Sequence, residues 1–377
     1  MTPTSRRDLL RYAAGASFLS LFPSLGLAAD DADGEAIPFL DADKLTPTKR
    51  EMLNWNELKE WVIPTKDLYH VSHYGVAQLK EENYKLTIDG LVEKPQTLTL
   101  DQIKSKPSKD VTVTLECGGN GIPGFMGAIG NIKWTGTPLA PILRECGMKD
   151  DAVEVAFWGA DSGRESVRDQ QVTQFFSRSL SIKNALRDDL LLCYAMNGQP
   201  LTQGHGFPLR LVVPGWFGIA WVKWLTRIEV RERPLMQRFM AKDYVTLRGQ
   251  QVGDQVVYTQ TSVGPMNIKS MVARAVRRKD GVIRISGAAW SDGTPLKSVE
   301  LKIDNGEWIP TTLGEQQKYT WTFWTYDWKD APAGEHTLVS RATDEKGRVQ
   351  PTADDPWIKL KKTYWESNQQ YPRKIKL

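Results

Sequence analysis

Hydrophobic and polar positions alternate over short stretches in the first two thirds of the chain and predict strands separated by turns. Residues 84–90 alternate and end at Asp89-Gly90, which is typical of a strand that runs into a turn. Further strands are expected at 111–116, 153–158, 190–196, 209–213 and 223–230, and short helices at 98–105, 139–146 and 180–186. This mixture predicts an α+β region. Residues 30–60 are polar and mixed and are expected to cover the surface.

The pattern changes near residue 260. Beyond it, β-branched and aromatic stretches occupy 282–287, 299–304, 319–324 and 336–342. Turn pairs such as Asp292-Gly293 and Asn305-Gly306 separate them. Short strands at this spacing predict an Ig-like antiparallel β-sandwich. The chain is therefore expected to divide into a first folded unit at 29–260 and a β-sandwich at 261–377.

The first residues are typical of an export signal rather than of a fold. Ser5-Arg6-Arg7-Asp8-Leu9-Leu10 precedes an apolar stretch that ends at Ala28-Ala29, so residues 1–28 are predicted to be a signal peptide. The paired arginines favour twin-arginine export, with an ordinary secretory signal as the alternative. Either route predicts a periplasmic protein. No other apolar stretch reaches the roughly 18 residues of a membrane helix, so no membrane span is expected.

Composition narrows the class of protein further. A chain of 377 residues has room for two domains, and its formal net charge of +4 is too small to suggest a nucleic-acid partner. The presence of only four histidines argues against a metal site built from histidines. The sequence lacks the Cys-x-x-Cys-His motif of attached c-type haem and the glycine-rich motifs of nucleotide sites. Cys146 and Cys193 lie in predicted elements and are expected to be core thiols.

Cys117 has a different setting, because an apolar strand delivers it to the turn Cys117-Gly118-Gly119-Asn120-Gly121. This turn has few side chains that would block a bulky group. A thiolate presented in this way suits a soft metal or a nucleophilic reaction. The alternative is a small buried hydrophobic side chain at the end of a strand.

A basic cluster follows in a stretch rich in glycine and proline. It contains Asn197-Gly198-Gln199-Pro200-Leu201, then His205-Gly206-Phe207-Pro208-Leu209-Arg210, and then Val222-Lys223-Trp224. Arginine offers a planar fork of donors and lysine a point charge, a combination that suits a phosphate group. Surface charges on a hairpin are the alternative interpretation.

Together these motifs resemble the sulfite oxidase family of molybdenum enzymes. The resemblance covers roughly residues 65 to 365 and includes Gly127-Ala128-Ile129-Gly130 with Trp134, and Gly159-Ala160-Asp161-Ser162. It implies a mixed α/β molybdopterin domain followed by an Ig-like β-sandwich similar to the family's dimerisation domain. It also implies Mo-molybdopterin as cofactor, oxygen-atom transfer as the reaction, and a homodimer as one expected state.

The resemblance further implies roles for seven residues. Cys117 would bind molybdenum, and metal coordination would keep the thiol deprotonated. His73, Asp161, His205, Arg210 and Lys223 fall at positions that hold the cofactor. Tyr244 falls at the position of the family's active-site tyrosine, where its hydroxyl would donate to the substrate or to a metal-bound oxygen. An ordinary half-buried aromatic side chain is the alternative for Tyr244.

Three positions depart from the family pattern. Val71 and Ile122 stand where the family usually has arginines, and Gly124 replaces a common tryptophan. A small hydrated anion needs charged partners in a cleft, so these changes favour a roomier and less charged pocket. Basic side chains elsewhere could compensate, and the candidates are Arg164, Arg168, Arg238 and Lys242.

The expected function is a periplasmic molybdopterin-dependent oxidoreductase acting on a small molecule. Sulfite oxidation to sulfate is the default, with electrons passing to an external partner, most simply a c-type cytochrome. A neutral or organic sulfur substrate such as a sulfoxide is the alternative within the same chemistry. A non-catalytic scaffold without metal is the alternative of another class.

Overall fold

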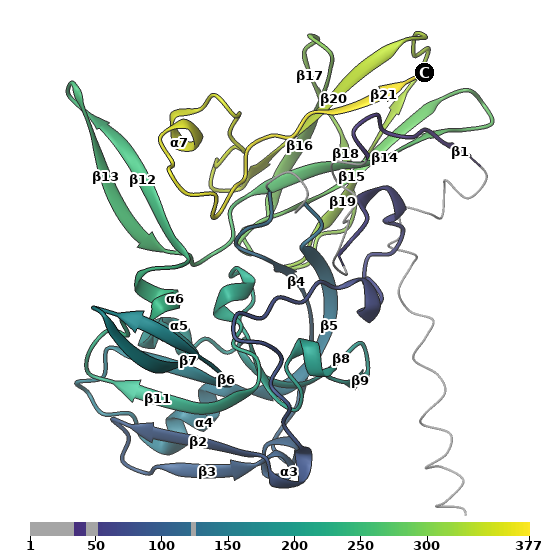
Figure 1. The fold of residues 1–377 in the computed structure, drawn as a ribbon. Coiled ribbons are helices and arrows are strands. Elements are labelled where there is room, and N and C mark those ends of the chain that lie inside the picture. Colours follow the sequence, from purple (N-terminus) through teal and green to yellow (C-terminus); the bar gives the residue numbers. More distant parts are fainter. Residues whose placement is uncertain (1–33, 43–51, 122–125) are drawn as a thin grey trace, which may run out of the picture.

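The computed structural model describes residues 34–42, 52–121 and 126–377. The predicted signal peptide at 1–28 lies outside these residues, as do Ile122 and Gly124. Strands dominate, and the few helices are short (Figure 1). Among the described helices, none combines the length and the apolar character needed to cross a membrane.

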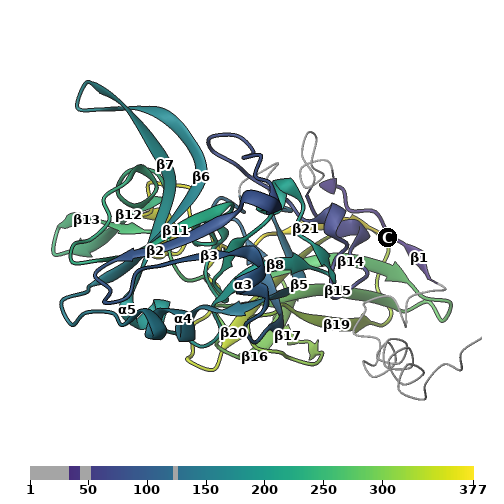
Figure 2. The same cartoon turned by 90° about the horizontal axis from the view of Figure 1, so that it is seen from below.

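A mixed sheet forms one side of the first half of the molecule (Figure 1). Its order is β3 (Gln96–Thr99), β2 (Lys85–Gly90), β11 (Leu225–Arg231), β6 (Glu154–Val167) and β7 (Gln170–Ser181). The β11–β2 pair is parallel and the other pairs are antiparallel. The strand predicted at 153–158 is much longer in the structure, because β6 continues through an irregularity after Trp158 and pairs with β7 to its end. Figure 2 shows the β6–β7 hairpin extending from the body.

A second sheet, antiparallel throughout, carries the turn that contains Cys117. Its order is β10 (Arg210–Val212), β8 (Leu191–Met196), β5 (Ile129–Pro138) and β4 (Lys109–Glu116), and β9 (Gln199–Pro200) pairs with β8. Burial increases along β4, from exposed residues at its start to fully buried ones at its end. The apolar alternation of this strand therefore leads the chain directly into the core just before Cys117.

Three short helices lie close to the predicted positions, namely α3 (Leu100–Lys104), α4 (Leu139–Cys146) and α5 (Ile182–Ala185). A fourth, α6 (Arg238–Ala241), was not predicted. Thr99 begins α3 with a capping box, and Gly147 ends α4 in the left-handed conformation. Single 3-10 turns lie at Trp55–Glu57, Thr65–Asp67, Glu81–Asn83, Gln203–His205 and Gly218–Ala220.

A projecting hairpin connects the two halves of the chain (Figure 1). It consists of β12 (Val245–Val252) and β13 (Gln255–Ser262) and was not predicted from the sequence. Most of its side chains are exposed, so its strands lack the burial contrast that follows from packing on a core. The domain boundary predicted at 260/261 falls within β13.

Two antiparallel sheets make up the second half and pack against each other. One has the order β1 (Glu35–Ala36), β14 (Lys269–Arg277), β15 (Ile283–Trp290), β19 (Thr322–Trp328) and β18 (Thr312–Leu313). The other has the order β17 (Trp308–Pro310), β16 (Leu296–Ile303), β20 (Glu335–Asp344) and β21 (Arg373–Lys376). Their facing side chains form a separate core that includes Val272, Ile285, Val299, Trp324 and Leu338. Helix α7 (Pro356–Lys359) precedes the last strand.

The predicted surface segment at 30–60 is partly buried instead. Trp55 is fully buried, stacks on Trp290 at 5.9 Å between ring centroids, and donates from its indole N–H to the Met126 carbonyl at 2.7 Å. Leu53 and Leu58 lie in the same core. A single tryptophan in a polar stretch carries no periodicity, which is why the pattern did not reveal this contact between the two halves.

Candidate active site

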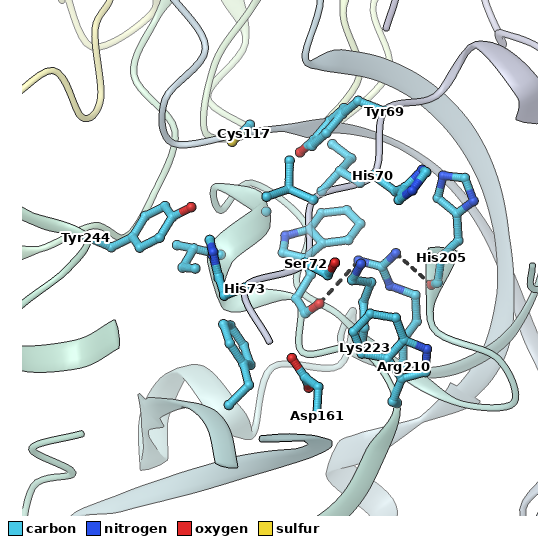
Figure 3. A pocket seen from close by; sticks show the side chains of 17 residues that line it. Tyr69, His70, Ser72, His73, Cys117, Asp161, His205, Arg210, Lys223 and Tyr244 are labelled. Carbon is cyan, nitrogen blue, oxygen red and sulfur yellow. Dashed lines mark hydrogen bonds between the residues drawn. The ribbon is translucent and has the colours of Figure 1, made fainter. Parts of the chain in front are cut away.

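One cavity brings together all seven residues for which the resemblance implies a role (Figure 3). Cys117 lies at one end, Tyr244 and His73 on one side, and the basic residues on the opposite side. The lining residues are Tyr69, His70, Val71, Ser72, His73, Leu115, Cys117, Asp161, Phe176, His205, Arg210, Gly218, Ile219, Trp221, Lys223, Trp224 and Tyr244. Residues separated by more than a hundred positions in sequence thus share one space.

The Cys117 turn is held tightly at the end of β4. The Cys117 N–H donates to the Ala128 carbonyl at 2.9 Å, and the Asn120 N–H donates back to the Cys117 carbonyl at 2.9 Å. A side chain at Gly118 would approach Val263 to 3.3 Å and the Tyr244 ring to 3.5 Å, so glycine permits this close packing. All three cysteines are reduced, and Cys117 is the one that lines the cavity. Cys117 is buried with the core, and its position in the cavity wall distinguishes it from Cys146 and Cys193.

A buried ionic network behind the turn was not foreseen from the sequence. Glu116 is fully buried and pairs with Lys269 of β14 at 2.6 Å. The same carboxylate accepts from the Trp290 indole at 2.8 Å and from the Asn120 amide at 3.0 Å. Lys269 also donates to the Asn120 carbonyl at 3.0 Å. Because Lys269 and Trp290 belong to the second half, the network fixes the thiol turn to the β-sandwich.

The basic side of the cavity is built from Arg210 and Lys223. Arg210 is 3% exposed and donates to the His205 and Trp221 carbonyls at 3.0 and 3.2 Å. Lys223 donates to the Gly204 carbonyl at 2.8 Å. Burial, reinforced by the Arg210 charge, lowers the pKa of Lys223 to about 7. Within the described residues, the hydrogen bonds of these two neighbouring basic side chains go to carbonyl groups, so neither side chain is neutralised by a direct ion pair there.

His205 supports this side from within. Its two ring nitrogens lie 2.7 Å from the Thr202 hydroxyl and 3.2 Å from the Leu68 carbonyl. The nitrogen next to the carbonyl must donate, so the other accepts from Thr202. Burial lowers the pKa of His205 to about 4, with a smaller effect from the Arg210 charge. A neutral ring with both nitrogens engaged orients the carbonyl that Arg210 binds.

Asp161 reaches the cavity through an irregularity in β6. Trp158 pairs with Ser177 and Ser162 with Phe175, so β6 holds two extra residues between these pairs. Such a bulge redirects a side chain out of the regular alternation. A side chain at Gly159 would lie 2.5 Å from the Asp161 carboxylate, which explains the glycine there. Burial raises the pKa of Asp161 to about 6.

An aromatic wall faces the basic side. The Tyr244 ring stacks on Trp365 with 4.0 Å between centroids and meets His73 edge-on at 5.3 Å. His73 also stacks on Phe239 at 4.7 Å. Burial lowers the pKa of His73 to about 4, with smaller effects from the Lys223 and Arg238 charges, so this wall is uncharged at neutral pH. Trp365, from the C-terminal segment, is a contributor that the sequence did not indicate.

The structure also locates the positions that depart from the family pattern. Val71 lines the cavity, so its replacement of an expected arginine bears directly on the pocket. The four basic residues considered as compensation do not line it. Arg238 is engaged by Glu165 and Asp243, and the side chains of Arg164, Arg168 and Lys242 are exposed. Among the described lining residues, the arginine and lysine side chains are Arg210 and Lys223 alone.

The donor set fits a phosphate-bearing metal cofactor. Two buried polar atoms of lining residues, Arg210 Nε and Asp161 Oδ1, have no hydrogen-bond partner in the described structure. Such atoms cost free energy unless a ligand satisfies them. Among the described residues, no group of three or more His, Cys, Asp or Glu is arranged to hold a metal ion. Cys117 is therefore suited to be one protein ligand of a metal whose other ligands come with a cofactor.

Removal of the Lys223 charge tests the basic side. In Lys223→Met we expect the purified protein to retain much less cofactor, measured as molybdenum per chain, because the phosphate contact that the resemblance implies for Lys223 would be lost. The cofactor-free variant should be at least as stable as the cofactor-free wild type, since a buried ammonium beside Arg210 is removed.

The pH dependence of this effect has a defined sign. The pKa of Lys223 is about 7 in the folded protein, whereas the ordinary pKa of lysine is 10.5. Between these two pH values the unfolded chain therefore binds more protons at Lys223 than the folded protein does. The stability of the cofactor-free wild type should therefore rise relative to Lys223→Met as the pH increases from 7 to about 10. Thermal melts at several pH values measure this, with exposed Lys85→Met as the control. If the difference in melting temperature between wild type and Lys223→Met does not change with pH, the lowered pKa of Lys223 would be contradicted.

Known proteins are similar to this chain in sequence and in fold. Residues 73–239 match the family described as oxidoreductase molybdopterin binding domain. Mitochondrial sulfite oxidase of Drosophila melanogaster is 32% identical over 327 residues, which covers 78% of this chain and 56% of that protein. Sulfite oxidase of Arabidopsis thaliana is 27% identical over 83% of this chain and 88% of that protein. The chain thus spans 56% of the length of the fly protein and 59% of the length of the mitochondrial sulfite oxidase of Macaca fascicularis.

A solved structure agrees with these matches. The crystal structure of the sulfane dehydrogenase SoxCD from Paracoccus pantotrophus has a TM-score of 0.75 and 26% sequence identity, covering 91% of this chain and 88% of that one. The predicted fold class is confirmed by this likeness, and the predicted Mo-molybdopterin cofactor by the family match. By its motifs, its cavity and these relatives, the chain belongs to the sulfite oxidase family of molybdopterin-dependent oxidoreductases.

Proposed function

We propose that this protein catalyses two-electron oxygen-atom transfer at the sulfur of a small substrate, with sulfite as the first candidate. The observation that supports this most is the placement of Cys117, the basic side and Tyr244 around one cavity. In sulfite oxidation, sulfite takes one oxygen atom from water and becomes sulfate, and two protons and two electrons are released.

Each side of the cavity has a distinct task in this proposal. Arg210 and Lys223 bind the cofactor phosphate, His205 orients Arg210, and Asp161 accepts hydrogen bonds from the pterin. Cys117 supplies the protein thiolate for molybdenum. Bound Mo-molybdopterin supplies the redox chemistry, as cofactors generally do. Tyr244 donates a hydrogen bond from its hydroxyl to an oxygen of the substrate.

Two assays test this function. Protein purified from a host that makes the cofactor should contain about one molybdenum per chain, and it should reduce ferricyanide when sulfite is added. Metal-free protein from such a host would support the scaffold alternative instead. Metal without sulfite turnover would exclude sulfite and leave the oxygen-transfer chemistry to be tested on a sulfoxide.

A neutral sulfur substrate is the second candidate, and Val71 is the observation that favours it. Val71 occupies the cavity wall where a guanidinium would attract an anion, and the aromatic wall is uncharged at neutral pH. Figure 3 shows Lys223 and Arg210 grouped away from Tyr244, on the side proposed for the cofactor. A substrate beside Tyr244 would therefore meet few positive charges among the described residues.

The Val71→Arg variant separates the two candidates. An added guanidinium can form a charge-assisted hydrogen bond with an anion, so kcat/KM for sulfite should rise by roughly tenfold. Turnover of dimethyl sulfoxide should not rise, and Val71→Leu serves as the control of similar apolar character. Steady-state assays with both substrates measure this. A sulfite rate equal in wild type and Val71→Arg would contradict the interpretation that the wild-type pocket lacks a cation.

Location and partners are further parts of the proposal. The paired arginines Arg6 and Arg7 support export to the periplasm by the twin-arginine route. Replacement of both by lysine, followed by cell fractionation, tests this, since a periplasmic double variant would exclude the route.

An external one-electron carrier such as a c-type cytochrome would take the electrons, and the β-sandwich would support a homodimer. Stopped-flow reduction of cytochrome c and light scattering test these two partners.

A further inference from the structure

Arg178 of β7 is a buried cation outside the set of predicted site residues. Its side chain is 2% exposed, and it forms no ion pair within the described part of the chain. Its Nε has no hydrogen-bond partner there. Burying a guanidinium without an ion-pair partner costs free energy. The hydrogen bonds of Arg178 are therefore expected to stabilise the segments that they join.

Arg178 fastens both ends of the segment that carries the projecting hairpin. It donates to the Phe239 carbonyl at the start of this segment and to the Val263 carbonyl at its end. It also donates to the Ser262 hydroxyl at 3.0 Å, and that hydroxyl donates to the Met240 carbonyl at 3.0 Å. One side chain therefore closes the base of the loop formed by residues 239–263.

Tyr244 lies inside this loop and depends on its closure. The Val263 N–H donates to the Tyr244 carbonyl at 2.8 Å, so the residue that Arg178 binds also holds the tyrosine backbone. Tyr244 has a φ of 56°, a left-handed backbone conformation that residues other than glycine rarely adopt. Such a conformation persists only where the surrounding contacts enforce it.

The same contacts reach the thiol turn. The methyl group Cγ1 of Val263 lies 3.3 Å from the position that a side chain at Gly118 would occupy, and the Tyr244 ring lies at 3.5 Å. Gly118 follows Cys117 directly. The bonds of Arg178 to Val263 thus fix the position of Tyr244 relative to the turn that presents Cys117.

We propose that Arg178 is a positioning residue that holds the Tyr244 hydroxyl in place over the cavity beside Cys117. This inference rests on the proposed function, in which Tyr244 is the hydrogen-bond donor to the substrate. A misplacement of about 1 Å at a reacting group can lower a rate by roughly 10²-fold. Arg178 therefore acts on the reaction through Tyr244 and has no contact with the substrate.

A kinetic cycle tests the coupling. Arg178→Met should lower kcat by roughly 10²-fold and leave KM within about threefold. In the double variant Arg178→Met/Tyr244→Phe, kcat should be close to that of Tyr244→Phe alone, because residues that act as a unit are not additive. Arg178→Lys should recover only part of the rate, since one ammonium cannot reproduce the planar fork.

The matched control is Arg373→Met. Arg373 is also fully buried and donates to a backbone carbonyl, that of Val272, but it lies in the β-sandwich. This variant should lose stability and keep the wild-type kcat. Should Arg178→Met fail to fold, Ser262→Ala removes one Arg178 bond and the bond to Met240 with a smaller change, and it should lower kcat in the same direction.

A spectroscopic measurement makes the test independent of turnover. In purified, cofactor-loaded protein labelled with 3-fluorotyrosine, the fluorine resonance that disappears in Tyr244→Phe identifies Tyr244. This resonance should shift or broaden in Arg178→Met and stay unchanged in Arg373→Met. An unmoved Tyr244 resonance, or additive effects in the cycle, would overturn the inference. Wild-type turnover in Tyr244→Phe would instead contradict the proposed role of Tyr244, so the two failures are distinguishable.

Discussion

Replacement of Cys117 by serine is expected to abolish turnover and leave the fold intact. A serine hydroxyl has nearly the shape of the thiol, but it is a hard and weakly acidic group, whereas a thiolate is a soft ligand. The turn keeps its backbone bonds to Ala128 and Asn120 in the variant. Sulfite-dependent ferricyanide reduction should fall to the background rate, with a stability loss of at most about 3 kcal/mol.

The control for this change is Cys146→Ser. Cys146 is fully buried at the end of α4 and does not line the cavity. Its replacement should cost stability, because a hydroxyl is buried among apolar groups, and it should leave kcat near the wild-type value. Normal activity in Cys117→Ser, or equal losses in the two variants, would contradict the ligand role of Cys117.

The second large effect is expected for Tyr244→Phe. Burial, with a smaller contribution from Cys117, raises the pKa of Tyr244, so its hydroxyl stays protonated and can donate. Loss of one preorganised donor to a developing charge lowers kcat by roughly 10²-fold or more. The stacking with Trp365 and His73 involves the ring, which phenylalanine retains. The free energy of unfolding should therefore change by less than about 1 kcal/mol.

Tyr84→Phe is the matched control for this second prediction. Tyr84 is as buried as Tyr244, at 5% exposed in each case, and its hydroxyl donates to the Leu225 carbonyl in the mixed sheet. Its loss leaves a buried carbonyl unsatisfied, so Tyr84→Phe should be less stable than Tyr244→Phe. In contrast, Tyr84→Phe should have a higher kcat than Tyr244→Phe. If both variants kept the wild-type kcat, the donor role of Tyr244 would be excluded.

Local sequence pattern was sufficient for most strands near the site. The alternation at 111–116 and the apolar run at 190–196 predicted β4 and β8 closely, and both strands are largely buried where they enter the core. Gly147 marked the end of α4, because glycine readily adopts the left-handed conformation that ends this helix. The seven residues carried over from the resemblance all line one cavity, while their individual roles stay predictions.

The elements that were missed depend on contacts between distant residues. The bulge in β6 has no periodic signature, and beyond it the strand continues past Asp161 by pairing with β7. The Glu116–Lys269 pair joins residues 153 positions apart, and a lysine in a strand carries no sign of its partner. Arg178 and Trp365 are of the same kind, since their importance comes from what the folded chain places beside Tyr244.

Molybdenum X-ray absorption spectroscopy of the purified, cofactor-loaded protein tests the central claim most directly. If the Cys117 sulfur binds the metal, the spectrum of Cys117→Ser will show one sulfur neighbour fewer than that of the wild type, while Cys146→Ser will match the wild type. The same number of sulfur neighbours in wild type and Cys117→Ser, at equal molybdenum content, would contradict the assignment of Cys117 as the protein ligand.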